Sequence, residues 1–161
     1  MVSCMKVQKS SRHSKITGDF CESVILYWLS KYGFECAKVD HTGIDIIARN
    51  PHTKEVMGIS VKGRSRNEGK EGTYVSIPND NFDKIIKACD AFNCVPYFAI
   101  VVDEKDKIYA FILSMKHLLS LFPKGNRVSG WKMTEKHIEK YQNDPNIMIF
   151  EFNYKTRKWW K

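Results

Sequence analysis

Residues 43–64 read GIDIIARNPHTKEVMGISVKGR. Within this stretch, residues 43–49 and 55–62 are rich in the aliphatic and β-branched side chains that strands favour. The sequence NPHT between them is typical of turns, because proline and asparagine favour the backbone geometry that a turn needs. The whole stretch therefore predicts a β-hairpin.

The predicted hairpin gathers polar side chains on one face. A loop of two or four residues pairs Asp45 with Gly58. Because side chains alternate along a strand, Asp45, Ser60 and Lys62 then share a face, with Asp45 and Ser60 as diagonal neighbours. The opposite face carries apolar side chains that suit a core, namely Ile44, Ile46, Met57, Ile59 and Val61.

Upstream of the hairpin, the spacing of apolar residues predicts a helix over 19–32. We expect Thr17 or Asp19 to cap its start and Gly33 to end it. Glu22 falls inside the apolar arc, where a carboxylate costs free energy unless it is paired or binds a cation. The alternative is a glutamate at the edge of that arc whose carboxylate reaches water. The inward face is expected to carry Cys21, Ile25, Trp28, Leu29 and Tyr32.

The rest of the chain predicts further helices and strands around this core. Residues 63–72 are rich in glycine and polar residues and predict a loop. The other expected elements are a strand over 34–39, a helix over 79–91 with Phe82, Ile85, Ile86 and Cys89 inward, strands over 95–103 and 107–113, a short helix over 115–121, a second at the end of 129–142, and a strand over 147–152. This order predicts an α/β fold with a central mixed β-sheet flanked by helices and a C-terminal α/β addition.

The 161 residues suit one domain, expected over 18–152, between a basic arm at 1–17 and a basic aromatic tail at 153–161. The net charge of +8 lies in the two ends, because residues 1–18 and 152–161 each carry four basic residues and no acidic one. Such ends attract polyanions, and nucleic acid is the commonest polyanion in a cytoplasm. The alternative is that the ends are solvating tails.

The five cysteines are odd in number, scattered and without a CxxC pair. This pattern argues against a disulfide framework or a zinc site and favours reduced thiols in a cytoplasmic protein. No apolar run approaches the ~20 residues that a membrane span needs, and the N-terminus lacks the apolar segment of a secretory signal. We therefore expect no membrane partner.

The order of an inward acid on a helix, an acid in a strand and a lysine ending the next strand resembles the PD-(D/E)XK superfamily. This superfamily includes restriction endonucleases and archaeal Holliday-junction resolvases. The matching positions are Glu22, Asp45 in GIDIIA, and Ser60-Val61-Lys62 in ISVKGR. The resemblance covers residues 18–103 and implies a restriction-endonuclease-like αβββαβ core.

The resemblance also implies a function, that of a metal-dependent DNA endonuclease or a Holliday-junction-resolvase-like phosphodiesterase with Mg²⁺ or Mn²⁺. By this likeness, Asp45 and the backbone carbonyl of Val61 are direct metal ligands, and Glu22 binds through water or holds a second ion. Lys62 orients the attacking water and stabilises the charged transition state. Resolvases of this family act as dimers, so a homodimer on DNA is implied as well.

Ser60 departs from the family pattern, which has an acid at this position. A serine hydroxyl is neutral and a weaker Mg²⁺ ligand than a carboxylate, and three interpretations follow. The site binds metal more weakly and still cuts, or a carboxylate from elsewhere, with Asp40 the nearest, replaces the missing one. In the third, the domain is a catalytically weakened nuclease-fold module that binds nucleic acid without cleaving it. A fourth, unrelated hypothesis is an α/β interaction protein with basic ends.

Three basic residues follow Lys62 closely, namely Arg64, Arg66 and Lys70. Phosphate oxygens are the commonest targets of such side chains in protein–DNA contacts. We expect these residues to hold phosphates beside the site, and the alternative is an exposed polar loop.

Overall fold

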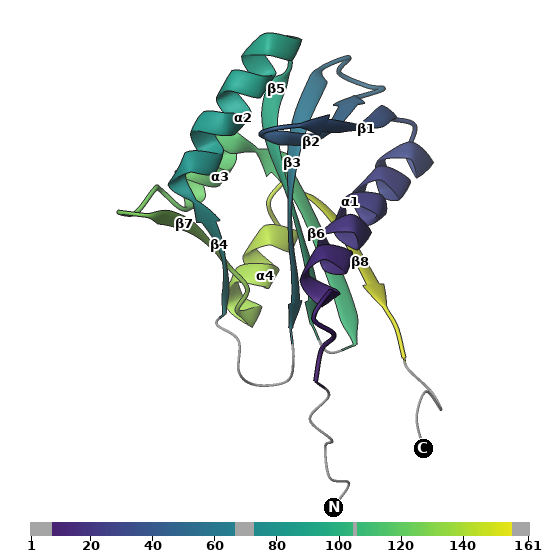
Figure 1. The fold of residues 1–161 in the computed structure, drawn as a ribbon, viewed down its shortest axis with the longest axis vertical. Coiled ribbons are helices and arrows are strands. Elements are labelled where there is room, and N and C mark those ends of the chain that lie inside the picture. Colours follow the sequence, from purple (N-terminus) through teal and green to yellow (C-terminus); the bar gives the residue numbers. More distant parts are fainter. Residues whose placement is uncertain (1–7, 67–72, 105, 156–161) are drawn as a thin grey trace, which may run out of the picture.

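Six strands form the central sheet of the computed structural model, which describes residues 8–66, 73–104 and 106–155 (Figure 1). Across the sheet their order is β1-β2-β3-β5-β6-β8. The strands are β1 (Glu35–His41), β2 (Ile44–Arg49), β3 (Val56–Arg66), β5 (Val95–Glu104), β6 (Lys107–Ser114) and β8 (Met148–Asn153). β3 and β5 are parallel and the other neighbours are antiparallel, so the sheet is mixed, as the sequence predicts.

The parallel pair of β3 and β5 needs a crossover connection. β4 (Tyr74–Pro78) and α2 (Asn79–Phe92) provide it. With α1 (His13–Lys31) ahead of β1, the element order contains the αβββαβ core expected from the sequence, with β4 as an insertion. After β6, the chain continues through α3 (Met115–Leu121), β7 (Val128–Lys132), α4 (Glu135–Gln142) and β8.

Figure 1 shows α1 and α2 on opposite sides of the central sheet. α1 buries residues spaced by about one helical turn against one core cluster, namely Cys21, Ile25, Trp28 and Leu29. α2 does the same against the other cluster with Phe82, Ile85, Ala88 and Cys89. Both faces of the sheet are therefore covered, which suits the apolar run of β5. None of the helices in the described ranges has the length and apolar character needed to span a membrane.

The hairpin of β2 and β3 pairs in a register different from the predicted one. Ile47, not Asp45, lies opposite Gly58, because the loop between the strands is longer than expected. A shift of two residues keeps Ile46, Met57 and Ile59 on one face, where they pack in the core cluster that α1 covers. Ile44 is an exception, because it packs in the cluster that α2 covers, so its predicted face is wrong. The ladder ends at the pair of Ile46 and Ile59, so Asp45 and Ser60, one residue further along each strand, are not ladder partners.

β3 is also longer than predicted. The sequence pattern predicts a loop over 63–72, but β3 continues to Arg66 because these residues pair with β5 as far as Glu104. Gly63 allows this packing, since a Cβ added there would lie 2.5 Å from the Sγ of Cys21 on α1. The loop prediction for residues 63–66 is therefore wrong.

α1 begins at His13, well before the predicted start at Asp19. Its first turn makes a tertiary contact that the local pattern does not reveal, because His13 Nε2 lies 2.9 Å from Ser65 Oγ on β3. Thr17 and Asp19 lie inside the helix, so the prediction that one of them caps its start is wrong. Gly33, with a φ of 86°, ends the helix as predicted.

Two residues predicted to face inward are exposed, Tyr32 by 59% and Ile86 by 38%. Tyr32 lies just past the last helical residue of α1, so the helical spacing no longer determines its direction. On α2, the buried face includes Ala88 in place of Ile86.

β4 and β7 form a second, two-stranded sheet that the sequence pattern does not predict. Tyr74 lies opposite Lys132, and Ser76 lies opposite Gly130. The buried face of this sheet carries Val75, Ile77, Ser129 and Trp131. Strands this short contain too few apolar residues to establish an alternating pattern.

Gly43, at the start of β2, determines how closely α2 approaches the strand that carries Asp45. Its φ is 105°, and a Cβ there would lie 2.6 Å from the carbonyl carbon of Lys84. We expect Gly43→Ala to lower the free energy of unfolding by about 2–5 kcal/mol, because a positive φ costs roughly 1–2 kcal/mol and overpacking roughly 1–3 kcal/mol. Urea denaturation measures this change.

Gly18→Ala is the matched control, because Gly18 lies within α1 and a Cβ there meets nothing within 4 Å. Alanine should stabilise the helix by about 1 kcal/mol at this position. A Gly43→Ala variant with the same unfolding midpoint as the unmodified protein would contradict the close packing of α2 on β2.

Candidate active site

Asp45 stands where the β2–β3 ladder ends. The pairing runs up to Ile46 and Ile59, and beyond it the backbone N–H of Val61 donates to Asp45 Oδ2 at 2.7 Å. In an antiparallel ladder, the N–H and C=O of one residue point to the same side of the strand. The carbonyl of Val61 therefore lies on the side of the Asp45 carboxylate, as the predicted ligand pair requires.

The carboxyl group of Asp45 is partly buried, and burial raises its pKa above the ordinary value. The negative charge of Glu22 raises the pKa further, whereas the Val61 N–H and the positive charge of Lys62 lower it. The two carboxylates, one from α1 and one from β2, are thus close enough to repel each other.

Glu22 is neither buried nor free in water. Its side chain is 22% exposed, and its Oε2 lies 2.7 Å from the Nζ of Lys38 on β1. The glutamate lies at the edge of the apolar face of α1 and forms an ion pair there. Because the Lys38 side chain is 51% exposed, this pair should contribute little more than the ~0–1 kcal/mol typical of surface ion pairs.

Sequence reasoning did not identify Lys38, which joins the site through that ion pair. It lies opposite Ile46, the residue after Asp45, in the β1–β2 ladder. The Glu22 carboxylate raises the pKa of Lys38, mainly through the hydrogen bond between them. The residues around Lys38 in the sequence do not indicate that it pairs with Glu22.

Ser60 and Lys62 lie on either side of Val61 in β3, the residue whose backbone N–H donates to Asp45. Ser60 is buried, with 4% of its surface exposed. Burial lowers the pKa of Lys62, while the negative charge of Asp45 raises it. The structure thus brings Asp45 close enough to Lys62 and to Glu22 of α1 for their charges to affect its pKa.

The groups here with the chemistry to hold a magnesium ion are oxygen donors, namely two carboxylates and one backbone carbonyl. Among the described residues, no group of three or more His, Cys, Asp and Glu side chains could hold a metal ion, so Asp40 does not supply the missing third acid. Mg²⁺ is often bound by one or two carboxylates with water and substrate oxygens completing its shell. Glu22, Asp45 and the carbonyl of Val61 fit that description.

The basic residues after Lys62 take different positions. Arg64 is exposed and donates to the carbonyl oxygen of Ser76 on β4 at 3.4 Å. Arg66 is only 7% exposed and lies 3.7 Å from the carboxylate of Glu104, which disagrees with its expected contact to phosphates. Lys70 lies outside the described residues.

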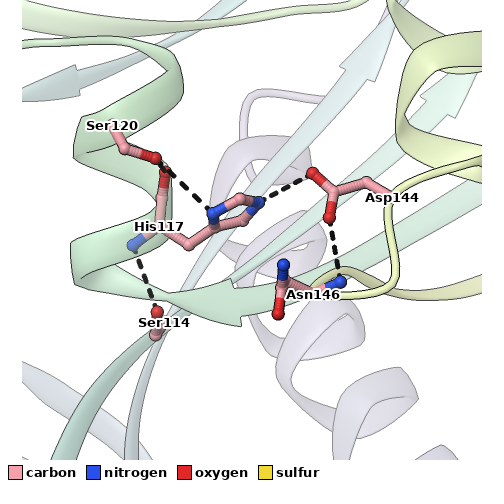
Figure 2. A network of polar contacts seen from close by, with 5 residues as sticks. All are labelled: Ser114, His117, Ser120, Asp144 and Asn146. Carbon is pink, nitrogen blue, oxygen red and sulfur yellow. Dashed lines mark hydrogen bonds and ion pairs between the residues drawn. The ribbon is translucent and has the colours of Figure 1, made fainter.

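A separate polar network joins α3 to the segment before β8 (Figure 2). His117 Nε2 lies 2.7 Å from Asp144 Oδ2, and Ser120 Oγ lies 3.5 Å from His117 Nδ1. The Ser120 hydroxyl donates to the carbonyl of His117 at 2.7 Å, so it is not directed at the imidazole as a nucleophile would be. Burial alone would raise the pKa of Asp144, but hydrogen bonds from Asn146 and His117 hold it below its usual value. The network therefore fixes α3 against the segment that leads into β8.

A comparison with solved structures supports the fold described above. The structure is similar to that of Hjc, a Holliday junction resolvase from the archaeal hyperthermophile Archaeoglobus fulgidus, with a TM-score of 0.51. The two sequences are 18% identical, and the match covers 68% of this chain and 86% of the resolvase. No family model and no curated protein matches the sequence. The likeness confirms the predicted nuclease-like α/β fold.

Asp45→Asn should stabilise the folded protein at neutral pH. Because burial raises the pKa of Asp45, the folded state binds this proton more tightly than the unfolded chain, and stability falls as pH rises between the two pKa values. Asparagine keeps an acceptor for the Val61 N–H without the charge. Thermal unfolding should show a higher midpoint for the variant at neutral pH, and the difference should vanish below pH ~4, the unfolded pKa.

Asp45→Ala is the control, because it removes the acceptor together with the charge. It should be less stable than Asp45→Asn at every pH, since it leaves the Val61 N–H without its partner. An Asp45→Asn protein that melts below the unmodified protein at neutral pH would mean that the carboxylate is not strained by burial.

Proposed function

We propose that the chain is a metal-dependent DNA endonuclease of the resolvase type, with Glu22, Asp45 and Lys62 as its site. The observation that carries this proposal is the hydrogen bond from the Val61 N–H to Asp45. It holds a carboxylate of β2 against β3, the strand that carries Lys62. Glu22 is the second carboxylate, close enough to affect the pKa of Asp45. The nuclease-like fold supports this assignment.

The side chains have complementary tasks in phosphodiester hydrolysis. Asp45, Glu22 and the carbonyl of Val61 hold a divalent cation, which when bound neutralises phosphate charge and makes a water more acidic. The ammonium group of Lys62 orients a water and donates to the phosphate oxygens as negative charge develops. Its partial burial strengthens that electrostatic interaction, because the local dielectric constant is lower than that of water.

DNA is the proposed substrate because the basic groups lie next to this site. Arg64 is exposed two residues after Lys62, and Lys84 on α2 adds positive charge close enough to lower the pKa of Lys62. The chain as a whole carries a net charge of +8. Contacts of this kind position a backbone without reading its sequence.

Cleavage of a four-way junction and of a linear duplex, in Mg²⁺ and in Mn²⁺, tests the proposal. Asp45→Ala and Lys62→Ala should each lower the rate by at least about 100-fold, because each removes a group that stabilises charge at the phosphate. Asp83→Ala and Lys87→Ala on the exposed face of α2 are the matched controls and should keep the full rate. Cleavage that survives both site substitutions would place the active site elsewhere.

A nuclease-fold module that binds DNA without cutting it is the second candidate. Ser60 favours it, because the site has one carboxylate fewer than the family pattern. The Lys38 ammonium also favours it, because it already neutralises part of the charge of Glu22.

This second candidate makes its own prediction for junction binding measured in EDTA. Affinity should fall with salt by about 0.9 log units per log unit for each phosphate contacted, and Arg64→Ala should reduce that slope by about one contact. Observing metal-dependent cleavage that requires Asp45 would exclude this candidate in favour of the first.

A further inference from the structure

An open cleft of about 580 Å³ lies along β7, and none of the candidate active-site residues lines it. One wall is the outward face of the small sheet, where Tyr74 of β4 and Lys132 of β7 are direct cross-strand partners. The other wall comes from α4, through His137 and Lys140. Phe122, Leu121, Pro123 and Tyr141 add apolar and aromatic surface.

Tyr74 offers a flat ring to anything that enters the cleft. Tyr74 is 53% exposed. Its ring lies beside Gly130, where an added Cβ would be 3.3 Å from Tyr74 Cδ2. Glycine at position 130 thus lets the ring lie against the backbone of β7. An exposed tyrosine alone is ordinary, so the charge of the cleft is the second observation that matters.

The charge of the cleft is positive. Lys132 and Lys140 line it and are exposed, and no acidic side chain among the described residues lines it. Burial is the main cause that lowers the pKa of His137. The positive charges of the neighbouring lysines lower it further, namely Lys132, Lys140 and Lys136. Several lysines therefore act on the same small volume, next to aromatic rings.

We propose that this cleft binds an unpaired stretch of nucleic acid, with a base stacked on Tyr74 and the neighbouring phosphates held by Lys132 and Lys140. Aromatic rings interleaved with lysines are the usual means of binding single strands, because every base has a face that can stack. Bases in a duplex already stack on each other and cannot lie flat on Tyr74. This binding goes beyond the proposed cleavage and does not depend on it.

The cleft is connected to the candidate active site through Arg64. This arginine lies two residues after Lys62 on β3 and donates to the carbonyl of Ser76. Ser76 lies two residues after Tyr74 on β4, on the outward side of the small sheet. A nucleic acid that contacts Arg64 can therefore continue toward Tyr74, so the cleft is suited to an unpaired strand next to a duplex or junction.

Fluorescence anisotropy in EDTA tests this inference, with a labelled oligothymidylate and a labelled duplex as probes. Tyr74→Ala should weaken binding of the oligothymidylate about tenfold, since one stacked base contributes roughly that factor, and Tyr74→Phe should bind normally. The double variant Lys132→Gln/Lys140→Gln should reduce the salt slope by about 1.4, at ~0.7 for each phosphate contact to a single strand.

Matched controls separate the cleft from general surface effects. Tyr27→Ala removes a tyrosine that is 63% exposed on α1, and Lys31→Gln/Lys87→Gln removes two exposed lysines outside the cleft. Both controls should bind the oligothymidylate like the unmodified protein. Duplex binding should be unchanged in Tyr74→Ala.

Two outcomes would overturn the inference. One is unchanged oligothymidylate binding in both Tyr74→Ala and the cleft double variant. The other is competition by polyglutamate as effective as that by oligothymidylate, which would indicate a general anion surface. Because EDTA prevents cleavage and Asp45 is left intact, either outcome leaves the proposed nuclease activity to be judged by its own assay.

Discussion

The hydrogen bond from the backbone of Val61 to the carboxylate of Asp45 is the contact on which the candidate site depends. At this point β2 no longer pairs with β3, and a side chain replaces the next backbone partner of the ladder. The bond orients the carboxylate and leaves the Val61 carbonyl beside it. Ser60 and Lys62 flank Val61 in the chain, so both are placed by the same strand. The cost is a partly buried carboxylate close to Glu22, and pKa values perturbed by burial and by a like charge are common at functional sites.

The serine at position 60 changes the balance of charge at this site. With an acid at position 60, three carboxylates would repel one another and create a strong demand for a divalent cation. With serine there, two carboxylates remain, and Lys38 and Lys62 already supply two positive charges beside them. Under the proposed function, a cation would compete with Lys38 for Glu22. The ion pair between Lys38 and Glu22 is half-exposed and weak, so a cation could displace Lys38. The two candidate functions, cleavage and binding alone, therefore differ in the metal affinity that they require.

Much of the fold could be predicted because it follows local patterns, and the proximity of Asp45 and Lys62 was expected from the predicted hairpin. The predicted register is wrong by two residues, yet Asp45 still lies beside β3, because its carboxylate accepts from the backbone N–H of Val61. Contacts between distant segments could not be predicted. The first turn of α1 makes a contact with Ser65 of β3, and Glu22 finds its partner Lys38 only after the helix packs beside β1. β4 and β7, each five residues long, are too short to show a pattern of their own.

Calorimetric titration of Mn²⁺ into the unmodified protein, Asp45→Ala and Ser60→Asp tests the central claim most directly. Our account predicts that the unmodified protein binds the ion, that Asp45→Ala abolishes the binding heat, and that Ser60→Asp binds more tightly because it adds a third carboxylate to the site. Binding that is unaffected by Asp45→Ala, or an absence of binding even in Ser60→Asp, would contradict the assignment of this strand end as a metal site.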